Sequence, residues 1–257
     1  MSTFLFDEII FGPVKSRRMG VSLGVNLLPK TVKYCNFNCV YCECGLTPLP
    51  HKDIMKLLPS RDEVRNALQT SLHTMQHLPD AITFAGNGEP TIHPEFVGII
   101  DDVIEMRNSL APKTEIVVLT NATQIHKPHI IEALSKVNRC MFKLDSAISS
   151  TIQSINQPNQ TIDIEKYIEN LRKFTGKIIM QTLFIRGTYN GVSFDNTTDA
   201  ELDALIAAYK RIEPHEIVVY GIQRDTPIST LTKTSKNELI SISNRIQKAG
   251  FTVSTSY

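Results

Sequence analysis

The sequence predicts an α/β protein built from six strand-and-helix units. Three observations predict this class: short runs rich in β-branched residues, longer segments with apolar residues at helical spacing, and regular alternation of the two along the chain. Alternation of this kind predicts parallel strands joined by right-handed crossovers. Six units can form an open doubly wound sheet or a barrel with fewer than the usual eight strands, and periodicity does not choose between them.

The expected elements follow one another in pairs. The strands are expected at residues 22–28, 81–86, 115–121, 140–145, 177–185 and 215–222. The helices are expected at residues 60–76, 93–110, 127–137, 162–174, 198–212 and 235–250. Ser60, with Glu63 three residues later, predicts a capping box at the start of the first helix, and Gly250 is expected to end the last one.

Composition limits the class of protein. The chain has 257 residues, of which 42% are hydrophobic and 21% charged, and no linker rich in Pro, Gly or Ser divides it, so we expect one globular domain. The formal net charge of +1 gives no global attraction to nucleic acid or to an anionic membrane. The N-terminus carries Asp7 and Glu8 and lacks a basic leader, and no apolar run reaches membrane-spanning length. We therefore expect a cytoplasmic protein without a membrane partner, in which clustered cysteines are metal ligands or redox groups.

Polar or Gly-rich segments follow each expected strand. They cover residues 35–42, 86–91, 120–123, 143–146, 184–187 and 221–227. In either α/β arrangement the carboxyl ends of the strands carry the chemistry. The series of polar strand ends therefore predicts one concave site for a polar ligand.

Four of the five cysteines lie within ten residues, and three of them, Cys35, Cys39 and Cys42, have the spacing C-x3-C-x2-C. Thiolates on one short loop suit a soft metal or an iron–sulfur cluster. The alternative is a structural zinc site that also uses Cys44, in a non-enzymatic metal-binding module. Zinc sites generally pair two separated Cys pairs, which this compact group does not provide. Three cysteines leave one iron of a four-iron cluster open to a substrate or cofactor.

Together these motifs resemble the radical S-adenosylmethionine (SAM) superfamily. The three cysteines have Tyr41 before the last of them, and Gly-Glu-Pro at residues 88–90 follows one unit later. The resemblance extends from about residue 11 to residue 228. It implies a partial (β/α)6 TIM-like barrel with mostly parallel strands, as a single core domain over residues 1–257 with a short N-terminal extension of about residues 1–20.

A narrower resemblance concerns the segment GPVKSRR, residues 12–18. It is similar to the short iron–sulfur oxidoreductases grouped with wyosine-tRNA synthases, in which G-P-V-P-S-R-R opens the chain. Lys15 here replaces the expected proline. This resemblance says little about the substrate.

The superfamily resemblance implies a [4Fe–4S] cluster held by Cys35, Cys39 and Cys42, with SAM on the fourth iron. Reductive cleavage of SAM would give a 5′-deoxyadenosyl radical that abstracts hydrogen from a substrate. The chain would then be a radical SAM oxidoreductase or transferase. An external flavodoxin or ferredoxin would supply the electron.

The resemblance also implies contacts to SAM. Glu89 is expected to receive its ammonium group, Gly86 and Gly88 to allow close backbone approach, and Tyr41 to lie beside the adenine. Further contacts to ribose or carboxylate are expected from Asn121, Lys143, Asp145 and Arg186. The alternatives are a helix cap for Asn121, a turn residue for Asp145 and a surface ion pair for Arg186.

The remaining residues leave the substrate open. Cys140 is expected to be a small buried hydrophobic residue, and Cys44 a spare or structural thiol. Arg17 and Arg18 are candidate substrate contacts, and their alternative role is to fasten the N-terminal segment. Three substrate classes stay open: a small molecule, a tRNA that is modified as by the wyosine-forming enzymes, and a partner protein that the enzyme activates or modifies. No catalytic side chain is assigned from the sequence.

Overall fold

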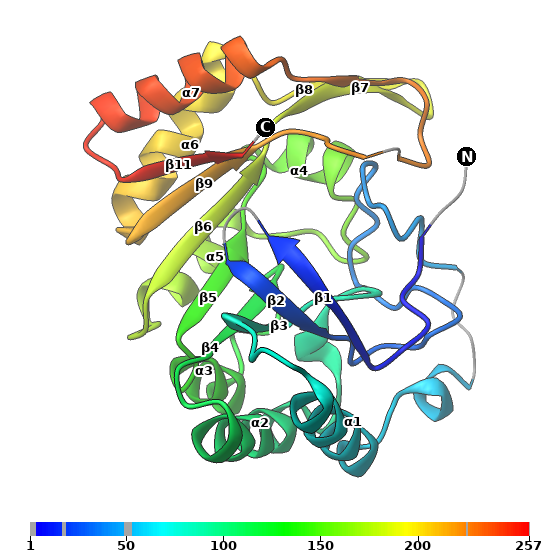
Figure 1. Ribbon diagram of the computed structural model, residues 1–257. Coiled ribbons are helices and arrows are strands. Elements are labelled where there is room, and N and C mark those ends of the chain that lie inside the picture. Colours follow the sequence, from blue (N-terminus) through cyan, green and yellow to red (C-terminus); the bar gives the residue numbers. More distant parts are fainter. Residues whose placement is uncertain (1–3, 17–18, 49–52, 225, 257) are drawn as a thin grey trace. The chain divides into compact units, whose positions relative to one another are not determined.

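The structure is a computed structural model that describes residues 4–16, 19–48, 53–224 and 226–256. It has the predicted mixed α/β class with a mostly parallel sheet of eight strands. Figure 1 shows its helices and strands in colours that follow the sequence. The described residues group into two compact units. We call them the N-unit, residues 5–35 and 47–140, and the C-unit, residues 1–4, 36–46 and 141–257. No helix among the described residues is long and apolar enough to cross a membrane.

The strands of the N-unit run in the order β1-β2-β3-β4. They are β1 Ile10–Ser16, β2 Gly20–Val25, β3 Ala81–Phe84 and β4 Glu115–Thr120. β2, β3 and β4 are parallel, whereas β1 pairs with β2 in the antiparallel direction. Three strands predicted in this part of the chain are therefore confirmed. The expected N-terminal extension contains β1, a strand that the sequence pattern does not predict.

Helices follow each parallel strand of the N-unit. They are α1 Arg61–Thr74, α2 Phe96–Leu110 and α3 Pro128–Ser135, with short 3-10 helices η1 Ile54–Leu57 and η2 Pro90–Ile92. The predicted capping box between Ser60 and Glu63 is present at α1. All four residues of β3 are buried, as expected in a parallel strand covered on both faces. The rings of Phe84 and Phe96 pack edge to face, with their centres 6.3 Å apart, and this contact holds α2 against β3.

The main strands of the C-unit are also parallel, in the order β6-β9-β11. They are β6 Ile178–Leu183, β9 Glu216–Tyr220 and β11 Val253–Ser256. β5 Arg139–Lys143 contributes its first two residues to the N-unit and its last three to the C-unit. The helices are α4 Ser149–Ile155, α5 Ile164–Arg172, α6 Asp199–Ile212 and α7 Lys236–Lys248. The expected helix end at Gly250 is confirmed, since α7 stops two residues before it and Gly250 has a φ of +101°.

A second, antiparallel sheet in the C-unit corrects one prediction. It has the order β10-β7-β8, with β7 Ile185–Tyr189, β8 Val192–Asp195 and β10 Leu231–Lys233. Residues 177–185 are expected to form one strand, but β6 ends at Leu183. The buried Asn196 side chain accepts from Ile185 N and donates to Leu183 O, both at 2.7 Å. These bonds replace the sheet ladder at this point, so the chain leaves the first sheet and continues as β7.

Candidate functional site

In the N-unit, the residue before Cys35 is paired with the Gly-rich loop after β3. Tyr34 N donates to Asn87 O at 2.9 Å, and Glu89 N donates to Tyr34 O at 3.3 Å. Tyr34 and Gly88 therefore form an isolated parallel bridge. This bridge places the first cysteine of the motif beside the predicted SAM-binding loop.

Gly86 and Gly88 are required by the shape of this loop. Their φ angles are +134° and +147°, which L residues with a side chain rarely adopt. A Cβ on Gly86 would overlap the Asn26 side chain, and one on Gly88 would overlap the Tyr34 carbonyl oxygen. The sequence predicts that these two glycines let the backbone approach a cofactor closely. In the structure they let the loop approach Asn26 and Tyr34, two other residues of the N-unit.

Glu89 is buried at the N-cap of η2, with 2% of its surface exposed. Its Oε1 accepts from Thr91 N at 3.1 Å, Thr91 Oγ1 at 2.5 Å and Thr120 Oγ1 at 2.7 Å. Its Oε2 accepts from Asn121 N at 2.6 Å. Burial raises the pKa of Glu89 above its ordinary 4.5, although these four donors act against that effect. All of the hydrogen bonds to the Glu89 carboxylate from described residues come from neutral donors. When ionised, Glu89 is therefore a buried negative charge that suits a cationic ligand.

Asn121 links this carboxylate to the cysteine motif. Its side-chain Nδ2 lies 3.9 Å from Cys35 Sγ, while its Oδ1 accepts from Thr123 N at 3.1 Å and Thr123 Oγ1 at 2.8 Å. The Thr123 contacts form a local turn ahead of α3. Of the predicted site residues, the N-unit therefore brings together Cys35, Gly86, Gly88, Glu89 and Asn121.

In the C-unit, residues 36–40 are held by the segment that follows α4. Asn38 N donates to Asn156 O at 2.9 Å, Val40 N donates to Ile155 O at 2.9 Å, and Phe37 forms an antiparallel bridge with Pro158. The chain then turns, with Cys42 N donating to Cys39 O at 3.0 Å. Cys39 is buried and Cys42 is partly exposed. These contacts fix the backbone of two of the three motif cysteines.

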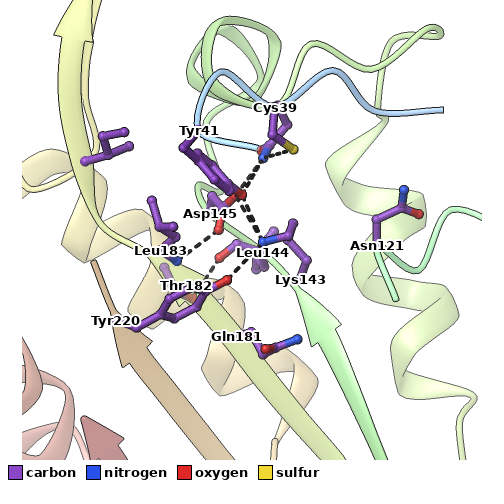
Figure 2. Close-up of polar contacts among 12 residues, drawn as sticks. Cys39, Tyr41, Asn121, Lys143, Leu144, Asp145, Gln181, Thr182, Leu183 and Tyr220 are labelled. Carbon is purple, nitrogen blue, oxygen red and sulfur yellow. Dashed lines mark hydrogen bonds and ion pairs between the residues drawn. The ribbon is translucent and has the colours of Figure 1, made fainter. Parts of the chain in front are cut away.

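Tyr41, Lys143 and Asp145 form a polar network in the C-unit (Figure 2). The Tyr41 hydroxyl donates to Asp145 Oδ2, and Lys143 Nζ donates to the hydroxyls of Tyr41 at 2.9 Å and Tyr220 at 3.1 Å. Lys143 Nζ also lies 3.7 Å from Asp145 Oδ2 and 5.1 Å from the centre of the Tyr41 ring. The side chain of Asp145 is 0% exposed and that of Lys143 is 20% exposed, so Lys143 is the more exposed member of this ion pair.

The charges of this network are set by burial and by Asp145. Burial alone would lower the pKa of Lys143, but the Asp145 carboxylate and the surrounding acceptors outweigh it and raise the pKa above its ordinary value. Burial and the same carboxylate hold the pKa of Tyr41 well above 10.0. Near neutral pH the network therefore contains an ammonium and a neutral phenol.

Two buried asparagines belong to this network, and no sequence motif indicates either. Asn156 Nδ2 donates to Asp145 Oδ2 at 2.6 Å and lies 3.4 Å from Cys39 Sγ. Asn196 Nδ2 donates to the backbone oxygen of Asp145 at 2.7 Å. Leu183 N completes the set with a bond to Asp145 Oδ1 at 3.0 Å. Asp145 is thus the centre of a fully hydrogen-bonded group rather than a simple turn residue.

The other predicted residues lie elsewhere. Arg186 belongs to β7, where it donates to Glu238 at 2.6 Å and pairs with Asp195 at 3.4 Å, which is the ion-pair alternative expected for it. Cys140 is 2% exposed, as predicted, and burial raises the pKa of its thiol. Arg17 and Arg18 lie outside the described residues.

The cysteine loop has one further tie in the C-unit. Glu43 stands between Cys42 and Cys44 in the sequence, and its carboxylate pairs with Arg224 at 2.9 Å. Arg224 belongs to the loop after β9, so this loop holds the end of the cysteine segment. Gly45 N donates to Cys42 O at 2.9 Å, which places the partly exposed Cys44 in a tight turn.

The three thiolates of the cysteine loop are a donor set that suits an iron–sulfur cluster. Within the residues that the structure describes, no three or more His, Cys, Asp and Glu side chains converge as the ligands of one ion do. Thiolates of a four-iron cluster each bind a different iron and stand farther apart. Amide donors lie at the sulfurs of Cys35 and Cys39, as is usual around cluster ligands.

A family model for the radical SAM superfamily matches residues 30–208. The chain belongs to this superfamily. A UPF0026 protein of Helicobacter pylori is 30% identical over 241 residues, which cover 91% of this chain and 72% of that relative. Members of the radical SAM superfamily use SAM and a [4Fe–4S] cluster, and they generally need a reductant such as flavodoxin or ferredoxin.

Solved structures of the superfamily share the fold. A radical SAM methyltransferase from Sphaerobacter thermophilus has a TM-score of 0.68 at 16% identity, over 92% of this chain and 66% of that one. Streptococcus suis SuiB bound to SAM has a TM-score of 0.65 at 13% identity, over 91% of this chain and 50% of that one. This chain thus spans just under two thirds of the methyltransferase and half of SuiB. These likenesses confirm the α/β fold class expected from the radical SAM resemblance.

Proposed function

We propose that this chain is a radical SAM enzyme in which Cys35, Cys39 and Cys42 hold a single [4Fe–4S] cluster and SAM binds the remaining iron. When bound, the cluster supplies the electron that cleaves SAM to methionine and a 5′-deoxyadenosyl radical, which abstracts hydrogen from the substrate. The observation that carries the proposal is the three-cysteine loop in a chain matched to the superfamily over residues 30–208. The outcome of the reaction makes it an oxidoreductase or a transferase.

Glu89 is proposed to receive the ammonium group of SAM. Its carboxylate is buried, and only neutral donors among the described residues bond to it. A cation at this position would offset the cost of the buried charge. Gly86, Gly88 and Asn121 support this role because they shape the loop and fix the carboxylate.

Lys143 is proposed to pair with the carboxylate of SAM, with the Tyr41 ring beside the adenine. Lys143 keeps its proton and is the partly exposed member of the network. Asp145 supports the proposal by holding the ammonium and the Tyr41 hydroxyl in place, since its own carboxylate is enclosed. Arg186 is a weaker candidate for a SAM contact because Glu238 and Asp195 already engage it.

The setting of the enzyme is proposed on the same grounds. A thiolate-bound cluster and clustered cysteines suit a reducing cytoplasm, and a flavodoxin or ferredoxin would deliver the electron near residues 35–44. Residues 1–257 are proposed to act as one radical SAM core domain. Arg17 and Arg18 remain candidate substrate contacts.

The proposal is tested by anaerobic reconstitution with iron and sulfide. We expect about four irons per chain and an electron paramagnetic resonance signal of the reduced protein that changes when SAM is added. Cys39→Ala should lose the cluster and Cys44→Ala should retain it. A colourless zinc protein, or iron near eight per chain from a second cluster, would contradict the proposal.

The substrate class is tested with the same protein. Small molecules, RNA and protein from a cell extract would be supplied separately, and 5′-deoxyadenosine release measured in each. We expect release above background with one fraction only. Equal release with all three would show that SAM cleavage is uncoupled from any substrate.

A further inference from the structure

Asn156 is placed to act on the proposed cluster through Cys39. It ends α4, where its backbone N donates to Ile152 O at 2.8 Å and its backbone O accepts from Asn38 N at 2.9 Å. These two bonds fix Asn156 between the helix and the cysteine loop. Asn156 is 2% exposed, so its side chain is enclosed by the protein.

The amide has one orientation that satisfies its neighbours. The atom nearest to them lies 2.6 Å from Asp145 Oδ2 and 3.4 Å from Cys39 Sγ, and both are acceptors when ionised. Only the NH2 end of an amide donates, so this atom is Nδ2. One hydrogen is taken by Asp145. The other has two acceptors at 3.4 Å, Cys39 Sγ and the Tyr41 hydroxyl.

A ligating thiolate is the better acceptor of the two. The Tyr41 oxygen already accepts from Lys143, whereas a cysteine bound to iron carries negative charge. Hydrogen bonds to ligand sulfurs stabilise the more negative, reduced state of a cluster and so raise its reduction potential. The direction of the effect follows from the charge of the reduced state.

We propose that Asn156 is a positioning residue that donates an N–H···S bond to Cys39 and raises the reduction potential of the cluster, an inference that rests on the proposed function. Asp145 holds the donor in place, because its bond to Nδ2 is the shorter one. Asn156 therefore couples the cluster ligand to the network of Tyr41 and Lys143. In the N-unit, the Asn121 amide stands in a similar but longer relation to Cys35, at 3.9 Å.

The test compares Asn156→Ala and Asn156→Ser with Asn159→Ala. Asn159 is an exposed amide three residues along the same loop, so it controls for the loss of an asparagine. Redox titration of the reconstituted proteins, followed by electron paramagnetic resonance, gives the potential. We expect the reduced-to-oxidised ratio of Asn156→Ala at a fixed potential to fall about tenfold, equivalent to about 59 mV for one electron, with no change in Asn159→Ala.

A second readout separates the N–H···S bond from the loss of support for Asp145. Fe–S(Cys) stretching bands in resonance Raman spectra should shift when the wild-type protein is reconstituted in deuterium oxide, and the shift should shrink in Asn156→Ala.

Iron content distinguishes the possible failures. Wild-type protein without a cluster would refute the proposed function itself. A cluster-loaded Asn156→Ala protein with wild-type potential and an unchanged deuterium shift would refute only the role of Asn156. Loss of the cluster from both Asn156 variants would also overturn that role, because Asn156 would then hold the loop rather than set the potential.

Discussion

Tyr41→Phe removes one hydroxyl from the centre of the polar network and leaves the ring in place. That hydroxyl donates to Asp145 and accepts from Lys143 at 2.9 Å, so both of these partners are charged. Asp145 keeps its bonds from Asn156 and Leu183 N, and Lys143 keeps the Tyr220 hydroxyl. Both charged groups therefore keep at least one hydrogen-bond partner in the variant. We therefore expect the loss of about 1.5–3 kcal/mol, the range for one hydrogen bond to a charged group, rather than the sum of two.

This loss should be visible in the apoprotein. A change of 1 kcal/mol lowers the melting temperature by about 2–4 °C in a chain of this size, so Tyr41→Phe should melt roughly 3–12 °C below wild type. Tyr189→Phe is the matched control, because no hydrogen bond of its hydroxyl to a described residue is found. Thermal and urea unfolding would be followed by circular dichroism. Equal melting temperatures for the two variants would refute the network as a source of stability.

Three further predictions concern the loop, the cofactor and the thiols. Gly88→Ala should cost about 2–4 kcal/mol in urea unfolding, since its φ is +147° and a Cβ would overlap the Tyr34 carbonyl; a loss below about 0.5 kcal/mol would contradict this. Protonation of Glu89 would remove the charge that is proposed to receive the ammonium of SAM, and burial raises the pKa of this carboxyl. Calorimetric affinity for SAM should therefore weaken as pH falls through a value above 4.5, and a flat profile would exclude Glu89 from the site. Iron analysis of Cys44→Ala should give about four irons per chain, and a cluster retained in Cys39→Ala would show that the ligands are assigned incorrectly.

Much of the fold follows from local patterns. All six expected strands and all six expected helices are present, because each has its own apolar periodicity and several have their own caps. The second sheet of the C-unit does not follow from such patterns. Residues 177–185 are mostly apolar and predict one strand, and the side chain that ends the strand, Asn196, lies more than ten positions later. α4 is also missed, because SSTIQSI is short, polar and without a side-chain cap.

The candidate site divides in the same way. The cysteine motif and Glu89 can be singled out from the sequence because their spacing in the chain resembles that of the radical SAM superfamily. Asn156 is not, because it meets Cys39 through the pairing of residues 36–40 with 155–159, across 117 positions of sequence. For Arg186, the sequence pattern indicates a position that the residue does not have. A polar residue after a mostly apolar segment suggests the end of a strand, but Arg186 belongs to the next strand, β7.

The measurement that tests the central claim most directly is formation of 5′-deoxyadenosine. Anaerobically reconstituted protein would be incubated with SAM and a low-potential reductant, and the nucleoside and methionine quantified by chromatography. We expect wild type and Cys44→Ala each to form 5′-deoxyadenosine and methionine in equal amounts. Cys39→Ala should form neither product. A cluster-loaded, SAM-binding wild-type protein that forms no 5′-deoxyadenosine with any substrate fraction, or an equal yield from Cys39→Ala, would contradict the account.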